Sequence, residues 1–266
     1  DFAETVAGPT CNQRDKEQKP PTEEFKQFAE LGVAGMTIPE NYGGQKLDDV
    51  SEAIVIEELS RVDPSLGVMV AVHVGLCSMT LVLNGNDEQK KRYLPKLASG
   101  EYLGAYSLSE AGSGTDAAAM VAKASDDGDY FTLNGEKMWV TNGTTADLFV
   151  IFAKVTDHPD YGKKKHGGVT CFVVEKGFDG FKVGKKEDKL GIRSSDTCTL
   201  ILDNCKVPKE NVLGEVGNGF GIAMNALDNS RIGIAAQALG IAQGAYESAL
   251  KYSKERETFG KPIAQH

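Results

Sequence analysis

The chain has 266 residues, enough for one large domain or two to three small ones at roughly 100 to 200 residues each. With 41% hydrophobic and 25% charged residues, it has the composition of an ordinary globular protein. Its 29 basic and 38 acidic residues give a net charge of −9, so nucleic acid is not an expected partner. Five cysteines without a C-x-x-C pair argue against disulfides and a zinc site, so we expect a reducing compartment and no metal.

Helical signals dominate the first hundred residues. The chain begins Asp-Phe-Ala-Glu, without an initiator methionine or a signal-peptide pattern, so we expect a processed or incomplete N-terminus. Pro20-Pro21-Thr22 predicts the start of a helix that carries Phe25, Phe28 and Ala29 on one face.

A second helix is expected to begin at Asp48 or Asp49, either of which can cap it, and to end at Arg61. Three of its apolar residues are expected to face inward: Val50, Ala53 and Ile54.

The stretch Leu66–Leu83 is apolar over about the length that spans a bilayer. It also contains polar residues and lacks basic or aromatic flanks, which favours a buried core helix over stable membrane insertion. Asn84-Gly85 should end this helix, and Asp87 should cap a short basic helix that runs to Leu97.

From residue 104 the pattern changes to short β-type runs. Two runs, Tyr130–Leu133 and Glu136–Thr141, flank Asn134-Gly135, a strong hairpin signal because both turn residues can adopt positive φ. Three further strands are expected, at Leu148–Val155, Val169–Glu175 and Thr197–Leu202. This spacing predicts a β-sandwich or barrel domain.

The helical period returns at Phe220. Apolar residues at spacings of three, four and seven predict one buried stripe: Met224, Leu227, Ile234, Ala238, Ile241, Ala245 and Tyr252. Arg231 falls inside this stripe, where its guanidinium would need an anionic partner. Asp228, three residues earlier, is one candidate partner, and a ligand phosphate is the other.

A glycine-rich run precedes the predicted hairpin. Gly112 to Ala117 superficially fits the G-x-G-x-x-A dinucleotide fingerprint, but no helix is predicted after it, so a Rossmann site is not expected. The longer run Tyr106–Asp116 offers N–H groups and hydroxyls for phosphate or carbonyl oxygens, although an inert loop is the alternative. The chain's one tryptophan, Trp139, follows, and its indole is suited either to stacking on a flat heterocycle or to a core position.

At these residues the sequence resembles the acyl-CoA dehydrogenase family of flavoproteins. Five segments carry the resemblance, in the same order: Ile38–Gly44, Tyr106–Asp116, Asn134–Gly143, Leu190–Ser195 and Arg256–Ile263. The resemblance implies an α+β multidomain fold with three parts. These are an N-terminal helical domain at 1–103, a middle β-domain at 104–213, and the first part of a C-terminal helical domain at 214–266.

The resemblance further implies FAD, bound without a Rossmann motif between the β-domain and the C-terminal helices. The implied FAD contacts are Tyr106, Ser107, Leu108, Ser109, Gly112, Gly114, Thr115, Trp139, Val140, Thr141 and Arg256, the last reaching the FAD of a neighbouring subunit. The implied acyl-CoA contacts are Thr115, Asp228, Asn229, Ser230 and Arg231.

The implied reaction is dehydrogenation of a short-chain acyl-CoA to a trans-2-enoyl-CoA, with electrons passed to an electron-transfer flavoprotein. In most family members the carboxylate base lies beyond the position of residue 266, and in a minority it is a glutamate at the position of Ser230. No catalytic base is therefore expected in this chain. We expect the chain to be C-terminally incomplete and the 266-residue polypeptide alone to be inactive.

Two other functions stay open. One is an acyl-CoA oxidase, in which oxygen reoxidises the flavin, and the other is a non-catalytic FAD- or acyl-CoA-binding assembly subunit. The resemblance implies a homotetramer built as a pair of dimers. It allows either bacterial cytoplasm or mitochondrial matrix as the location.

Overall fold

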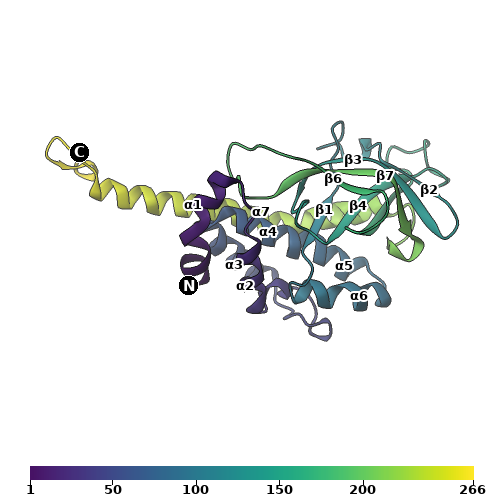
Figure 1. Ribbon diagram of the computed structural model, residues 1–266, viewed down its shortest axis with the longest axis horizontal. Helices are drawn as coiled ribbons and strands as arrows, with labels where there is room; N and C mark the ends of the chain where they lie inside the picture. Colours follow the sequence, from purple (N-terminus) through teal and green to yellow (C-terminus); the bar gives the residue numbers. More distant parts are fainter.

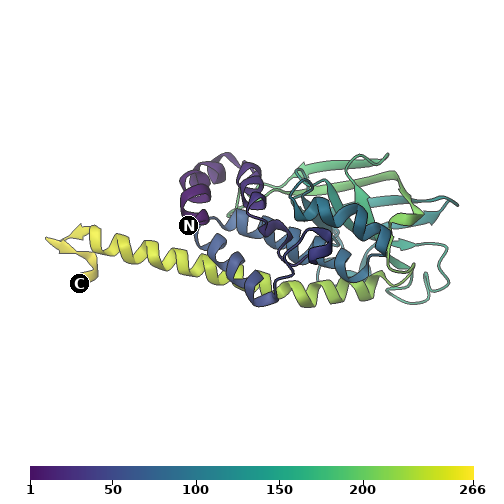
Figure 2. The ribbon, with the colours of Figure 1, turned by 90° about the horizontal axis from the view of Figure 1, so that it is seen from below.

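A computed structural model describes residues 1–266. The strands of the large sheet lie together at one end of the molecule, helices α2 to α6 lie below and beside them, and α7 runs along both and projects beyond them to a small hairpin near the C-terminus (Figures 1 and 2). The helical segments before the sheet are η1 Ala3–Ala7, α1 Gly8–Glu17, α2 Thr22–Glu30, α3 Asp49–Val62, α4 Pro64–Ala71, η4 Val72–Ser78, α5 Met79–Asn84 and α6 Asp87–Ala98. Short 3₁₀ turns are η2 Val33–Gly35, η3 Glu40–Tyr42, η5 Ala117–Ala119, η6 Lys209–Asn211 and η7 Ile263–Gln265.

Helix α2 is as predicted, with Phe25, Phe28 and Ala29 buried. Helix α3 is capped by Asp48, whose Oδ1 accepts the Ser51 N–H at 2.9 Å.

Of the predicted inward face of α3, only Ala53 packs against the core, beside Ile56 and Ala71, and the other two predicted positions are wrong. Val50 and Ile54 are 66% and 57% exposed, whereas Ile56 and Leu59 are buried. Helix α3 packs against both α4 and α7, and the residues that meet these neighbours follow a different phase of the same helical period.

The residue that caps helix α6 is one position earlier in the chain than predicted. Asn86, and not Asp87, is the capping residue, because it forms a reciprocal capping box with Gln89.

The long apolar stretch forms continuous helical structure from Pro64 to Asn84, in which η4 is a π-helical segment. By length and composition it could cross a membrane, but 72% of its most apolar window is buried inside the protein. His73 ties it to its neighbours: Nδ1 accepts the Gly104 N–H at 3.0 Å, and Nε2 lies 3.1 Å from the Leu97 carbonyl. This helix is therefore the central core helix that the polar residues indicated.

The strands form one mixed eight-stranded sheet, with the order β6-β7-β3-β2-β4-β5-β8 and β1 added to β4. Its strands are β1 Gly104–Ser107, β2 Lys123–Asp126, β3 Tyr130–Thr141, β4 Leu148–Val155, β5 Val169–Glu175, β6 Phe181–Lys186, β7 Thr197–Pro208 and β8 Val212–Leu213. A separate small hairpin joins β9 Glu257–Thr258 to β10 Lys261–Pro262. Strand β1 runs parallel to β4, which places the start of the small-residue run inside the sheet.

The predicted hairpin at Asn134-Gly135 is wrong. These residues lie within β3, a single strand paired with β7, at a register shift between Leu133 and Gly135. Gly135 has a φ of +148° and lies so close to Ala122 that an added Cβ would be 2.8 Å from the Ala122 Cβ. The glycine therefore serves a β-bulge and a close approach of two strands, which the same dipeptide also permits.

Helix α7, Gly219–Glu255, is present, but its predicted stripe is buried only in part: Met224, Leu227 and Ile241 are half-buried. Ile234 and Tyr252 are 48% and 57% exposed, and the buried face instead carries Ile222, Ala223, Ala226, Gly233, Ala236, Gln237 and Gly240. The small residues mark where α7 crosses α3 closely: a Cβ on Gly240 would be 2.2 Å from the Glu57 carbonyl oxygen. Helix contact here follows side-chain size and not hydrophobicity.

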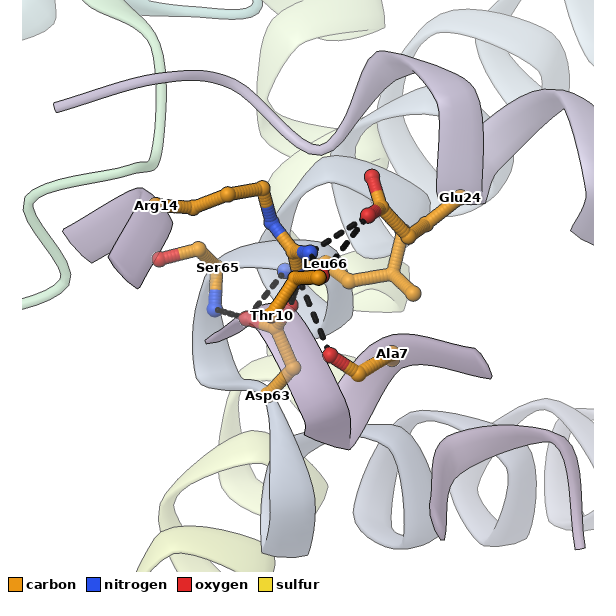
Figure 3. Close-up of polar contacts among 7 residues, drawn as sticks. All are labelled: Ala7, Thr10, Arg14, Glu24, Asp63, Ser65 and Leu66. Carbon is orange, nitrogen blue, oxygen red and sulfur yellow. Dashed lines mark hydrogen bonds and ion pairs between the residues drawn. The ribbon is translucent and has the colours of Figure 1, made fainter. Parts of the chain in front are cut away.

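A buried arginine connects the first helices (Figure 3). Arg14 of α1 pairs with Glu24 of α2 and with Asp63, and it also donates to the Ala7 carbonyl at 3.2 Å. Asp63 in turn caps α4, because its Oδ1 accepts the N–H groups of Ser65 and Leu66. The cluster fixes α1 and α2 against the start of the core helix.

Candidate functional site

A cleft of about 380 Å³ lies between the sheet, the core helix and α7. Its walls come from four segments distant in sequence: η4, the run after β1, the end of β3, and the first turns of α7. The lining residues are Val72, Leu76, Tyr106, Leu108, Ser109, Gly114, Thr115, Ala117, Met138, Trp139, Thr141, Met224 and Leu227.

Tyr106 is set in the wall by β1. Its ring packs against Phe152 of β4, with the ring centroids 5.2 Å apart. Its hydroxyl is buried without a hydrogen-bond partner in the chain, and burial raises the pKa of this phenol well above its usual value. A neutral buried O–H at a cleft is available to a ligand, since leaving it unpaired is costly.

The small-residue run is fastened to β3. The Met138 N–H donates to the Ser109 carbonyl at 2.9 Å, and the buried Lys137 ammonium donates to Glu110 Oε1 at 2.7 Å. Burial lowers the pKa of Lys137, and the adjacent Glu110 carboxylate opposes that shift. The run is thus held in place against β3.

Trp139 adopts a left-handed backbone conformation, with φ +56°, at the register shift between Lys137 and Val140. The bulge turns the indole outward, so that it lines the cleft while remaining 59% exposed. The tryptophan and the small-residue run therefore share one cleft, and the core alternative for Trp139 is excluded.

Thr141 is placed by the turn that follows β3. Asn142, with φ +66°, donates its side-chain N–H groups to the Met69 and Gly104 carbonyls at 3.1 and 3.0 Å. Asp196 holds the next residues, because its Oδ2 accepts the N–H groups of Thr144 and Thr145. These contacts tie the end of β3 to the core helix and to β1, and so fix the Thr141 side of the cleft.

The structure brings together seven of the residues predicted for the cofactor: Tyr106, Leu108, Ser109, Gly114, Thr115, Trp139 and Thr141. Ser107 and Val140 are buried behind the wall, and Gly112 is exposed beside it. Arg256 follows the end of α7, 29 residues after Leu227, or about 44 Å at the helical rise, so it does not reach this cleft within one chain.

The four predicted substrate residues on α7 directly follow Leu227. Arg231 is exposed and pairs with Asp228 at 2.6 Å, while Ser230 is half-buried and Asn229 is exposed. The expectation of a buried Arg231 is thus wrong, and the acidic partner proposed from its spacing is the one present. Both side chains are about 70% exposed, at 70% and 72%, and free to reorient.

Six lining residues were not predicted as site residues: Val72, Leu76, Ala117, Met138, Met224 and Leu227. The sequence did indicate Met138 as a candidate site residue, since it adjoins Trp139. Val72 and Leu76 had none, because almost every residue of the core helix is apolar.

A second hollow, of about 420 Å³, is rich in lysines, and Ala118 in its lining directly follows Ala117 of the cleft. Lys123, Lys154, Lys163 and Lys164 line it together with Lys165, which pairs with Asp116. The Lys154 Nζ donates to the Ala118 carbonyl at 2.9 Å, and burial lowers its pKa. In a protein of net charge −9, this region is a local positive surface.

Comparisons with known proteins match these three structural parts in order. Residues 1–101, 105–205 and 217–266 match the sequence models of the acyl-CoA dehydrogenase N-terminal, middle and C-terminal domains. A short-chain specific acyl-CoA dehydrogenase of Clostridium acetobutylicum is 44% identical over 99% of this chain, which spans 68% of that relative.

Solved structures agree. Butyryl-CoA dehydrogenase from Megasphaera elsdenii matches with a TM-score of 0.93 at 41% identity, over 99% of this chain and 69% of that one. A structure described as the electron transferring flavoprotein of Acidaminococcus fermentans matches with a TM-score of 0.94 at 45% identity, over 100% of this chain and 68% of that one.

Helical, mixed-sheet and helical parts that meet around one cleft define an α+β flavoenzyme architecture, as the family resemblance implied. The chain belongs to the acyl-CoA dehydrogenase family. This is a family of FAD-dependent oxidoreductases.

Proposed function

We propose that this protein dehydrogenates a short-chain acyl-CoA to the trans-2-enoyl-CoA at the cleft described above. The observation that carries the proposal is the meeting of Trp139, Thr141 and the Tyr106–Thr115 run in one cleft closed by α7. The relatives named as short-chain specific support the chain length.

The residues of the cleft fit a flat, polar cofactor ring. Trp139 offers an exposed indole face, and Tyr106 offers an unpaired buried hydroxyl. Gly114 leaves open space, since an added Cβ would meet nothing within 4 Å. When bound there, FAD would supply the hydride acceptor. The chain would hold it through the run, Trp139 and Thr141, with Arg256 reaching the FAD of a neighbouring subunit.

The acyl-CoA is proposed to enter past Thr115 and the Asp228–Arg231 segment of α7. Thr115 lines the cleft, and Arg231 can leave its exposed pair with Asp228 to bind a phosphate or carbonyl oxygen. The lysine-rich hollow would raise the local concentration of an anionic substrate such as a CoA ester.

Removal of the α-proton needs a base within hydrogen-bond reach. No carboxylate lines the cleft, and Ser230 has only a hydroxyl, which lies 3.4 Å from the Leu227 carbonyl. We propose that the base comes from beyond residue 266, and that the 266 residues alone do not turn over acyl-CoA.

The proposed electron acceptor is an electron-transfer flavoprotein, supported by the description of one matching structure. A homotetramer is proposed because family members generally form one. Relatives occur in bacteria and in mitochondria, so bacterial cytoplasm or the mitochondrial matrix is the proposed location.

An absorbance titration tests this function. The full-length protein should purify with a flavin spectrum that bleaches on anaerobic addition of butyryl-CoA. Recovery of the colour should need an electron-transfer flavoprotein; rapid recovery with oxygen alone would indicate an acyl-CoA oxidase. A colourless protein that takes up no FAD would rule the proposal out, and a stable flavin that butyryl-CoA does not bleach would indicate a binding subunit.

A further inference from the structure

A buried ion pair lies directly behind the cleft wall. Lys137 of β3 has no exposed surface, and its Nζ donates to Glu110 Oε1 at 2.7 Å and to the Leu108 carbonyl at 3.1 Å. Glu110 is 3% exposed. Neither residue lines the cleft, so neither is placed to touch a ligand in it.

Glu110 also holds the chain that follows the run. Its Oε2 accepts the Val121 N–H at 2.6 Å, and its Oε1 accepts the Ala122 N–H at 3.2 Å. The run is therefore fastened at its start, through Leu108, and beyond its end, through Val121 and Ala122. The Lys137 ammonium joins both points to β3, the first directly and the second through the Glu110 carboxylate.

The same pair is coupled to Trp139 through the backbone. Lys137 is the last paired residue of β3 before the register shift that ends at Val140, and Trp139 lies inside that shift. A displacement of Lys137 must move Trp139 relative to the run, because only Met138 separates them. Since a buried charge that loses its partner is costly, the pair disfavours any alternative spacing of these two segments.

We propose that Glu110 and Lys137 are positioning residues, whose ion pair sets the spacing between the Tyr106–Thr115 run and Trp139. The inference rests on the proposed function only in taking the occupant of this space to be the flavin ring of FAD. The spacing itself is a property of the chain without a ligand.

The double variant Glu110→Gln/Lys137→Met tests this, because it removes both charges and leaves neither buried alone. Trp139 is the chain's one tryptophan, so its fluorescence reports the cleft wall directly. We expect native far-UV circular dichroism, a shifted Trp139 emission maximum, altered acrylamide quenching, and an FAD dissociation constant raised roughly tenfold, as for other supporting residues.

The matched control is Asp203→Asn/Lys182→Met. It removes an exposed ion pair of similar length, 2.9 Å, between β6 and β7 of the same sheet. The Trp139 fluorescence and the FAD dissociation constant of this control should equal those of the parent chain.

The proposal is overturned if the folded Glu110/Lys137 variant keeps the parent's Trp139 fluorescence and FAD dissociation constant. It is equally overturned if this variant and Glu110→Gln alone both lose their circular dichroism, because the pair would then support the whole sheet and not the wall. If the parent itself binds no FAD, the proposed function fails, while the Trp139 comparison still decides the positioning role.

Discussion

His73 shows how one polar residue organises a helix that otherwise reads as uniformly apolar. Burial lowers its pKa to about 4, so the ring is neutral near pH 7. Because Nδ1 accepts from the Gly104 N–H, Nε2 carries the proton and donates to the Leu97 carbonyl. A protonated ring could not accept the hydrogen bond from the Gly104 N–H. Protonation of His73 would therefore weaken the attachment of β1 to the core helix.

We therefore expect acid to destabilise the protein through His73. Above pH 6.5 the ring is neutral in both states; below it the unfolded chain binds a proton that the folded chain refuses until about pH 4. The unfolding free energy should fall by up to about 3 kcal/mol across that window. Urea unfolding between pH 7 and 4.5 should show a shallower pH dependence for His73→Gln. His166→Gln, at an exposed position in the loop before β5, is the matched control. Equal slopes in the parent and both variants would contradict the assignment.

Glu52 changes the pH dependence of stability in the direction opposite to that of His73. It is 9% exposed on α3, without a hydrogen-bond partner, and burial, followed by the nearby Asp49, raises its pKa to about 7. The charged form is thus disfavoured in the folded state and the neutral form is not.

Glu52→Gln should raise the unfolding free energy at pH 8, by about 1–3 kcal/mol, because the parent carboxylate is then ionised and poorly solvated. The gain should shrink as the pH falls towards 5, where the folded parent is protonated. Urea unfolding at both pH values measures it. Glu58→Gln, 59% exposed on the same helix, should change stability by less than about 0.5 kcal/mol. A pH-independent effect of Glu52→Gln would refute the assignment.

At the scale of elements, close helix contacts are set by glycines. On α7, Gly240 and Gly244 lie against the backbone of α3, where added Cβ atoms would be 2.2 and 2.1 Å from carbonyl oxygens. Neither contact involves a flexible side-chain end, so the helices would have to separate. Hydrophobic periodicity could not reveal this face, because the glycines carry no hydrophobic signal.

Gly240→Ala should therefore destabilise the protein by about 1–3 kcal/mol, although alanine favours a helix by about 1 kcal/mol. Thermal or urea unfolding measures the change. Gly221→Ala, near the exposed start of α7, is the control and should be neutral or stabilising, since its Cβ meets only the Asn218 side chain. Stabilisation by Gly240→Ala would show that α3 and α7 are not in close contact in solution.

At the scale of the whole molecule, the cleft exists only where the helical part, the sheet and α7 meet. Helix α7 contributes both to the cleft and to a long segment that extends away from the rest of the protein (Figure 2). Leu239 and Tyr246, which lie on one side of α7, are 55% and 62% exposed. Exposed apolar residues along one helix favour association.

We expect the 266-residue chain to self-associate through the side of α7 that carries Leu239 and Tyr246. Light scattering should give a mass above 28.5 kDa that rises with concentration. Leu239→Glu/Tyr246→Glu should shift it towards the monomer, because burying the new charges is costly. Ala245→Glu/Ser248→Glu adds the same charge at exposed positions on other sides of α7 and should not. A monomeric parent at every concentration would contradict this expectation.

Sequence by itself determined the order of helical and β parts, the location of most elements, and the residues of the small-residue run and Trp139 that share the cleft. These features follow from local periodicity, turn residues and motifs, all of which depend on residues close together in the sequence. Only the tertiary structure decided which helix faces are buried, that Asn134-Gly135 is a bulge, and that Glu110 and Lys137 pair behind the wall. Those outcomes depend on which distant segment packs against each residue. The local sequence around a residue does not specify that segment.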